Sequence, residues 1–233
     1  PSALADLNEG QWDKAARAIM TTDTYPKLSS RSLDINGCQV VVTGISKGAG
    51  MIQPNMATML AFVATNATVA HDDLQMLLAE TADRTFNCIT VDGDTSTNDA
   101  CVLIASGKSP KLSPGTPAFD AFSKAVHDVL SELSEAIVRD GEGATKLIRI
   151  LVEGARDREE ARTVGKTIAH SPLVKTAFFA SDPNWGRILA AVGRAGCENL
   201  AIENVAIWLD DVQIVEAGGR CASYTEEAGA EVM

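Results

Sequence analysis

The sequence has 233 residues, of which 45% are hydrophobic and 22% are charged, a composition typical of folded globular proteins. Its 20 Lys and Arg against 31 Asp and Glu give a formal net charge of −11, which disfavours nucleic acids and anionic membranes as partners. Five widely spaced cysteines without a C-x-x-C pattern indicate free thiols, and no spacing typical of a metal site occurs. With no signal segment and no apolar run that spans a bilayer, we expect a cytoplasmic protein without a metal.

Helices are predicted where apolar residues recur at helical spacing. These segments cover 12–19, 72–86, 119–137, 157–169 and 185–192, the last after a cap at Asp182-Pro183. Strands are predicted where apolar and β-branched residues run together. They cover 39–45, 59–65, 88–91, 100–105, 146–153, a short stretch at 178–179 and a hairpin at 205–215 that turns at Asp210-Asp211. Because helices and strands interleave, the sequence predicts an α/β or α+β fold.

The polar loop 92–99 interrupts these elements and could be interpreted as a metal site. In the loop 92–99, Asp92, Asp94 and Ser96 stand at alternating positions, as in a calcium-binding loop. However, Thr97 stands where that loop requires glycine and Leu103 where it requires glutamate, which excludes calcium. We therefore expect 92–99 to be a hairpin-like turn capped by its own side chains.

The glycine-rich segment 44–62 is the most unusual part of the sequence. Its glycine spacing fits neither a phosphate-binding loop nor a dinucleotide fingerprint. Gly44-Ile45-Ser46-Lys47-Gly48 matches the G-x-S-x-G nucleophile elbow, with Ser46 as the nucleophile. That motif must lead directly into a helix, which the following glycines and Pro54 disfavour.

The Ala57–Thr58 bond in the same segment permits a different chemistry. A threonine hydroxyl can attack the carbonyl of a small preceding residue, and hydrolysis of the resulting ester leaves Thr58 with a free α-amine. An α-amine has an unperturbed pKa of about 7.7–8.0 and can serve as the general base for its own hydroxyl. The residues alone do not distinguish this nucleophile from a threonine that begins a strand.

Five longer segments occur here in the order that they have in one enzyme family. The segments are Met20–Lys27 (MTTDTYPK), 44–62, Thr90–Asp99 (TVDGDTSTND), Asp140–Lys146 (DGEGATK) and Ser181–Arg187 (SDPNWGR). Over most of its length the chain therefore resembles the glutamate N-acetyltransferases, also called ornithine acetyltransferases, which act in arginine biosynthesis. The resemblance implies the layered α/β fold of self-cleaving threonine-nucleophile acyltransferases of the ornithine acetyltransferase/DmpA type, with sheets flanked by helices.

The resemblance also implies a mechanism. The precursor is cut between Ala57 and Thr58 into α and β chains that stay associated, as a dimer of αβ units. Thr58 takes the acetyl group of N-acetylornithine as an ester, and L-glutamate removes it. The substrate-contacting positions of the family are matched here by Thr24, Lys47, Thr58 and Glu142. We expect Lys47 to bind the substrate carboxylate and Glu142 its ammonium group.

On this basis we divide the chain into a catalytic region, 1–141, and a C-terminal α/β region, 142–233. Family members extend beyond both ends of this sequence, so we expect the oxyanion-stabilising residues to lie upstream and further pocket residues downstream. No cofactor is implied, although some members also use acetyl-coenzyme A as a donor. Two alternatives stay open: a threonine-nucleophile aminopeptidase or amidase, in which water accepts the acyl group, and a non-catalytic remnant that binds amino acids or partners.

Overall fold

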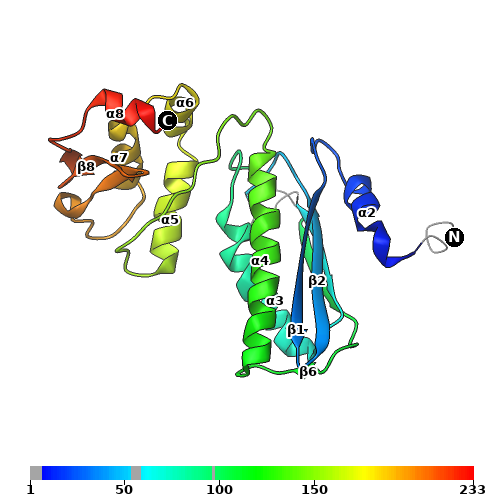
Figure 1. Ribbon diagram of the computed structural model, residues 1–233. Helices are drawn as coiled ribbons and strands as arrows, with labels where there is room; N and C mark the ends of the chain where they lie inside the picture. Colours follow the sequence, from blue (N-terminus) through cyan, green and yellow to red (C-terminus); the bar gives the residue numbers. More distant parts are fainter. Residues whose placement is uncertain (1–6, 54–58, 96–97) are drawn as a thin grey trace. The chain divides into compact units, whose positions relative to one another are not determined.

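The computed structural model describes residues 7–53, 59–95 and 98–233 (Figure 1). The chain forms two compact units, Pro1–Ala144 and Thr145–Met233, each with its own hydrophobic core. The units divide after Ala144, whereas the sequence analysis placed its boundary after Gly141. Both units mix helices with small sheets, which confirms the predicted α/β class.

The first unit is built on a four-stranded sheet with the order β1-β2-β3-β5. Its strands are β1 (Lys27–Ile35), β2 (Cys38–Lys47), β3 (Leu60–Thr65) and β5 (Ala100–Ala105). The pairs β1–β2 and β2–β3 are antiparallel, and β3–β5 is parallel. A separate pair of short parallel strands consists of β4 (Thr68–Val69) and β6 (Lys111–Leu112).

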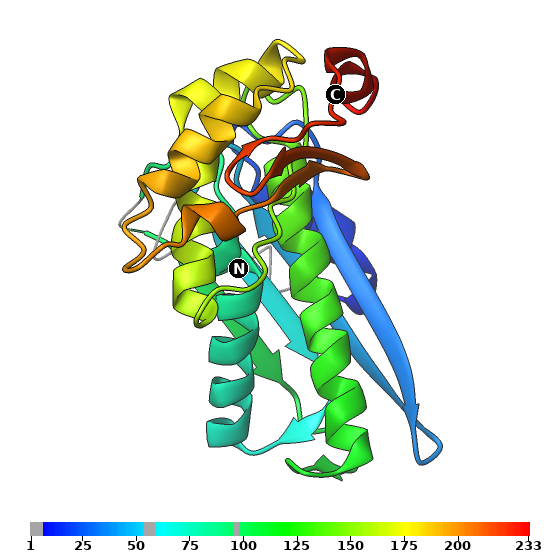
Figure 2. The same ribbon diagram turned by 90° about the vertical axis from the view of Figure 1, so that its left-hand side faces the viewer.

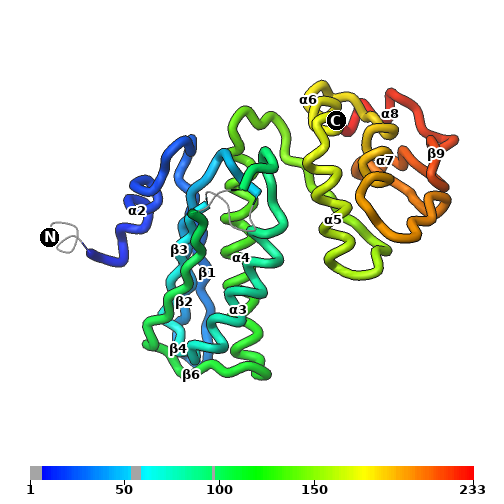
Figure 3. The backbone as a smooth tube through the Cα atoms, turned by 180° about the vertical axis from the view of Figure 1, so that it is seen from behind, coloured from blue at the N-terminus to red at the C-terminus, as the bar shows by residue number. Residues whose placement is uncertain are grey.

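Two long helices cover one face of this sheet. Figure 2 shows α3 (His71–Arg84) and α4 (Pro117–Arg139) side by side against the strands. The buried face of α4 repeats at helical spacing, as the sequence predicted, through Phe122, Val126, Val129, Leu133 and Ile137. The short helices of this unit are η1 (Glu9–Gln11), α2 (Trp12–Ala18) and η2 (Phe86–Cys88), and Figure 3 shows α2 on the opposite side of the sheet from α4.

Strand register gathers several chain segments at one end of the sheet. Lys27, at the start of β1, lies opposite Ser46, and Lys47, at the end of β2, lies opposite Leu60. Leu60 in turn lies opposite Ala100, the first residue of β5. The residues just before β1, just after β2, just before β3 and just before β5 therefore meet at this end.

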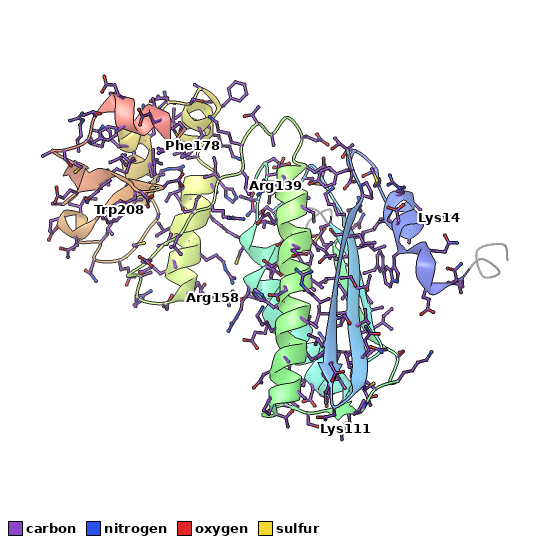
Figure 4. The ribbon with its side chains drawn as sticks, in the orientation of Figure 1. Lys14, Lys111, Arg139, Arg158, Phe178 and Trp208 are labelled. Carbon is purple, nitrogen blue, oxygen red and sulfur yellow. The ribbon has the colours of Figure 1, made fainter. Side chains whose placement is uncertain are left out.

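The second unit packs four helices around a small antiparallel sheet. Its elements are α5 (Arg158–Ala169), α6 (Pro172–Phe179), α7 (Trp185–Gly193), η3 (Ile202–Asn204), β7 (Ile207–Leu209), β8 (Val212–Glu216), β9 (Gly219–Arg220) and α8 (Glu226–Glu231). Phe178 packs against the core of this unit, whereas Trp208 is 54% exposed (Figure 4). In the parts of the chain that the structure describes, no helix is both long and apolar enough to cross a membrane.

Most predicted elements are confirmed, and three predicted strands are wrong. Residues 88–91 form the end of a 3-10 helix and an irregular stretch, and the loop 92–99 leads into β5, which pairs in parallel with β3 rather than as a hairpin. Residues 146–153 form no strand, because they join no sheet among the described residues. Residues 178–179 end a helix, α6, which starts with a Ser171 cap.

Two further differences concern single segments. The helix predicted to begin at Asp182-Pro183 is capped instead by Asn184, whose side chain accepts a hydrogen bond from the amide of Arg187. Strand β1 was missed because its sequence is mostly polar. Its inward positions include Lys27 and Ser29, which are buried here without the apolar pattern that predicts a strand.

Candidate active site

A cleft of about 330 Å³ lies at the end of the first unit's sheet where β2 ends. Its lining consists of Thr21, Thr22, Lys47, Gly48, Ala49, Gly50, Met51 and Glu142. The structure thus brings together two predicted substrate-binding residues, Lys47 and Glu142, that lie far apart in the sequence. The volume is within the range of small-molecule sites.

Lys47 occupies the last position of β2 and is 8% exposed. Its positive charge acts on Asp99: burial raises the pKa of the Asp99 carboxyl group, while the Met59 amide and the Lys47 charge partly oppose this rise. A lysine this buried favours an anionic ligand, because the charge is poorly hydrated.

Glu142 follows the C-terminal end of α4 and is exposed, as its glycine neighbours suggested. Its amide donates a hydrogen bond of 2.8 Å to the carbonyl oxygen of Ala49. Its carboxylate lies against Gly50 so closely that a Cβ atom on Gly50 would stand 2.8 Å from the Glu142 Oε1. The glycine therefore leaves the space in which this carboxylate sits.

Thr24 is exposed but is not among the residues that line the cleft. Its hydroxyl donates a hydrogen bond to the Asp140 carboxylate, and its amide lies 3.0 Å from the Asp140 Oδ2. Because the hydroxyl proton is engaged by a carboxylate, only the lone pairs of this oxygen stay available. Thr24 is thus prepared to accept a hydrogen bond from a ligand rather than to donate one.

A buried ion cluster next to the cleft is not predicted by the sequence pattern. The Lys27 Nζ lies 2.6 Å from the Asp23 Oδ1 and 2.6 Å from the Asp140 Oδ2, with side-chain exposures of 0%, 0% and 2%. Burial alone would raise the pKa values of both carboxyl groups, but hydrogen bonds, including those from Lys27, outweigh it and lower them. Asp140 directly follows Arg139, which Figure 4 places at the end of α4.

The polar loop that begins at Asp92 binds the backbone at Met51 and Ile52, at the end of the glycine-rich lining of the cleft. The Asp92 carboxylate accepts hydrogen bonds from the amides of Met51, at 2.6 Å, and Ile52, at 3.0 Å. It also accepts one from the amide of Asp94 within its own loop, which agrees with the expected side-chain capping. In the part of the chain that the structure describes, no group of three metal-ligating side chains is present.

The predicted nucleophile Thr58 and the preceding Ala57 lie outside the described residues. The next residue, Met59, is buried, and its amide donates a hydrogen bond to the Asp99 carboxylate. The other oxygen of Asp99 is buried and has no hydrogen-bond partner among the described residues. Asp99 therefore fixes the backbone immediately after the position of the nucleophile.

The alternative nucleophile Ser46 does not fit its motif. It lies within β2, where it pairs with Lys27 on one side and Ala61 on the other, and it is 1% exposed. A nucleophile elbow requires an exposed serine at a sharp turn between a strand and a helix. Among the cysteines, all of which are free thiols, burial raises the pKa of Cys101 to about 12, which disfavours a reactive thiolate there.

Comparisons with known proteins identify the family of this chain. The model of the ArgJ family matches residues 1–233. The chain is 66% identical to the arginine biosynthesis bifunctional protein ArgJ of Methylococcus capsulatus and 53% identical to that of Pseudomonas fluorescens, in each case over 100% of this chain. It spans 58% of the length of each of these relatives.

A solved structure gives the same result for the fold. The crystal structure of the arginine biosynthesis bifunctional protein ArgJ from Bacillus halodurans matches with a TM-score of 0.69 and 42% sequence identity. The match covers 73% of this chain and 80% of that one. Because the family model matches residues 1–233 and the relatives are 66% and 53% identical over the whole of this chain, the chain belongs to the ArgJ family.

Proposed function

We propose that the full-length protein transfers the acetyl group of N-acetylornithine to L-glutamate, as a step of arginine biosynthesis. The observation that carries this proposal is the cleft, which presents an ammonium group from Lys47 and a carboxylate from Glu142 to one small volume. Opposite charges that line one cleft match an amino acid, which carries a carboxylate and an ammonium group. Two relatives are named for arginine biosynthesis, and we therefore choose the substrates among the amino acids of that pathway.

The proposed reaction proceeds through an ester on Thr58. The bond between Ala57 and Thr58 is hydrolysed first, which frees the α-amine of Thr58. The Thr58 hydroxyl then attacks the acetyl carbonyl carbon and gives its proton to the α-amine, which returns it to the departing nitrogen of ornithine. The amine of glutamate attacks the ester next, forms the new amide bond and restores the hydroxyl.

The same ester permits a second acetyl donor. Acetyl-coenzyme A would load Thr58 by the same attack, with the thiol as the leaving group in place of an amine. No further carrier is needed, because the acetyl group stays on the enzyme's own hydroxyl between the two steps. We propose that the cleaved α and β chains stay associated as a dimer of αβ units.

The experiment that tests the nucleophile compares the full-length protein with its Thr58→Ala variant. We expect the denatured mass and N-terminal sequencing of the wild type to give a β fragment that begins at Thr58, and the variant to stay uncut without activity. Consumption of acetylornithine should require added glutamate. Consumption without glutamate would favour the aminopeptidase or amidase alternative, and a folded, uncut wild type would rule out the Thr58 mechanism.

A further inference from the structure

We propose that Lys27 is a positioning residue for amino-acid binding, because its buried ammonium group holds the polar walls of the cleft in place. The inference rests on the proposed function, since it assigns the cleft to an acetylated amino acid and its acceptor. Lys27 does not line the cleft itself. It acts through Asp23, which binds the backbone of the glycine-rich segment, and through Asp140, which binds Thr24.

The first connection runs through Asp23 to the glycine-rich wall. The Asp23 Oδ1, which binds the Lys27 ammonium group, also accepts a hydrogen bond of 2.7 Å from the amide of Gly48. The other oxygen of Asp23 accepts one of 3.2 Å from the amide of Thr21. Gly48 and Thr21 both line the cleft, and Gly48 directly follows Lys47.

The second connection runs through Asp140 to Thr24 and to the turn that carries Glu142. Asp140 caps the C-terminal end of α4 and lies two positions before Glu142 in the sequence. Its carboxylate binds Lys27 through one oxygen and accepts hydrogen bonds from both the amide and the hydroxyl of Thr24. The position of Thr24 and the start of the turn that carries Glu142 are therefore fixed by one charged group.

The charge of Lys27 also determines which way the Thr24 hydroxyl points. Two carboxylates share one ammonium group in a site that water does not reach. Without that group, repulsion and burial would favour protonation of one carboxyl group. A protonated Asp140 could donate to Thr24 and reverse the polarity of its hydroxyl. Lys27 keeps Asp140 ionised, so that the Thr24 hydroxyl stays a donor to Asp140 and its lone pairs stay available to accept a hydrogen bond.

A role in anchoring β1 to α4 explains this cluster less well. A second ion pair, between Arg31 and Glu132, already joins the same two elements nearer the solvent. Buried ion pairs contribute little net stability compared with apolar residues of similar volume, because both charges lose their hydration. The cluster is better explained by the geometry that it gives to the cleft.

The test is a steady-state analysis of the full-length protein carrying Lys27→Met, which nearly keeps the length of the side chain and removes its charge. We expect the KM for N-acetylornithine to rise at least about tenfold, because small displacements of binding groups cost this much or more. A loss of folded enzyme alone would lower the apparent kcat and leave KM unchanged. The control Arg31→Met removes the exposed ion pair of the same strand and should leave KM unchanged.

Asp140→Asn provides the decisive second variant, particularly if Lys27→Met does not fold. It keeps an acceptor for Thr24 and removes the charge that binds Lys27, and KM should rise in the same direction. If each of these two variants that folds has the same KM as the wild type, Lys27 does not position the cleft. A folded wild type that does not consume acetylornithine in the presence of glutamate would instead overturn the proposed function, and with it the ligand assigned here.

Discussion

Gly50 and Glu142 show how one missing side chain can shape a binding site. The Glu142 carboxylate lies in the space that a Cβ atom on Gly50 would enter. The backbone of Gly50 does not adopt the left-handed conformation that would itself require glycine. The glycine is therefore explained by its close approach to the carboxylate, which is a functional group in the proposed mechanism.

Replacing Gly50 by alanine should displace the Glu142 carboxylate without changing its charge. Because only the mobile end of a side chain has to move, we expect the thermal midpoint of unfolding to change little. The KM for acetylornithine should rise by roughly threefold to tenfold, since the binding group is moved. Steady-state kinetics beside Glu142→Gln, which removes the charge at nearly constant size, check this. A KM that rises in Glu142→Gln and stays at the wild-type value in Gly50→Ala would contradict it.

The packing of β2 on α4 is the contact between elements on which the site depends. At Gly44 the strand approaches the helix so closely that a Cβ atom would stand 2.9 Å from the Leu133 Cδ1 and 3.0 Å from the Val129 Cγ1. Both of these side chains are buried and closely surrounded. Gly44 lies three positions before Lys47 in the same strand, so this contact sets how closely the strand that carries the lysine approaches α4.

Replacing Gly44 by alanine should destabilise the protein by about 1–3 kcal/mol, because an extra methyl group in a packed core forces its neighbours to shift. Urea unfolding of the full-length protein followed by circular dichroism measures this loss. Gly193→Ala, in α7, is the matched control. A Cβ atom there meets nothing within 4 Å, so we expect no loss and a gain of up to about 1 kcal/mol from helix propensity. Equal free energies of unfolding for the two variants would show that the β2–α4 approach is not tight.

At the scale of the whole molecule, the buried carboxylates of the first unit determine how stability changes in acid. The pKa values of Asp23 and Asp140 are lower in the folded protein than the ordinary value of 3.8. The unfolded chain therefore binds protons more readily, and the stability that these groups provide is present above that value and lost as the pH falls below it. Asp99, with a raised pKa, acts in the opposite direction.

We expect the thermal midpoint of the wild type to fall steeply as the pH is lowered from about 4 to about 2, where these carboxylates take up protons because their pKa values lie below 3.8. The Asp140→Asn variant lacks one of the two groups and should show a shallower dependence over the same range. Differential scanning calorimetry at several pH values measures both. Parallel curves for the wild type and the variant would show that Asp140 does not carry the proposed share of this dependence.

The elements that repeat locally and the residues that form motifs could be predicted from the sequence. The apolar spacing of α4, the buried run in β2 and the turn at Asp210 were predicted because each depends on neighbours along the chain. The family motifs likewise located Lys47 and Glu142, which the structure places in one cleft. Thr58 was also located in this way, and its role stays a prediction.

Which polar residues are buried together could not be predicted and is known only from the folded chain. Lys27 and Asp140 are 113 positions apart, and nothing in the composition around either residue indicates an ion pair that is shielded from water. The segment 146–153 was predicted as a strand and is not one. A run of strand-forming residues becomes a strand only where another strand pairs with it. Local patterns fix what a segment can form, whereas burial and pairing depend on what the rest of the fold places beside it.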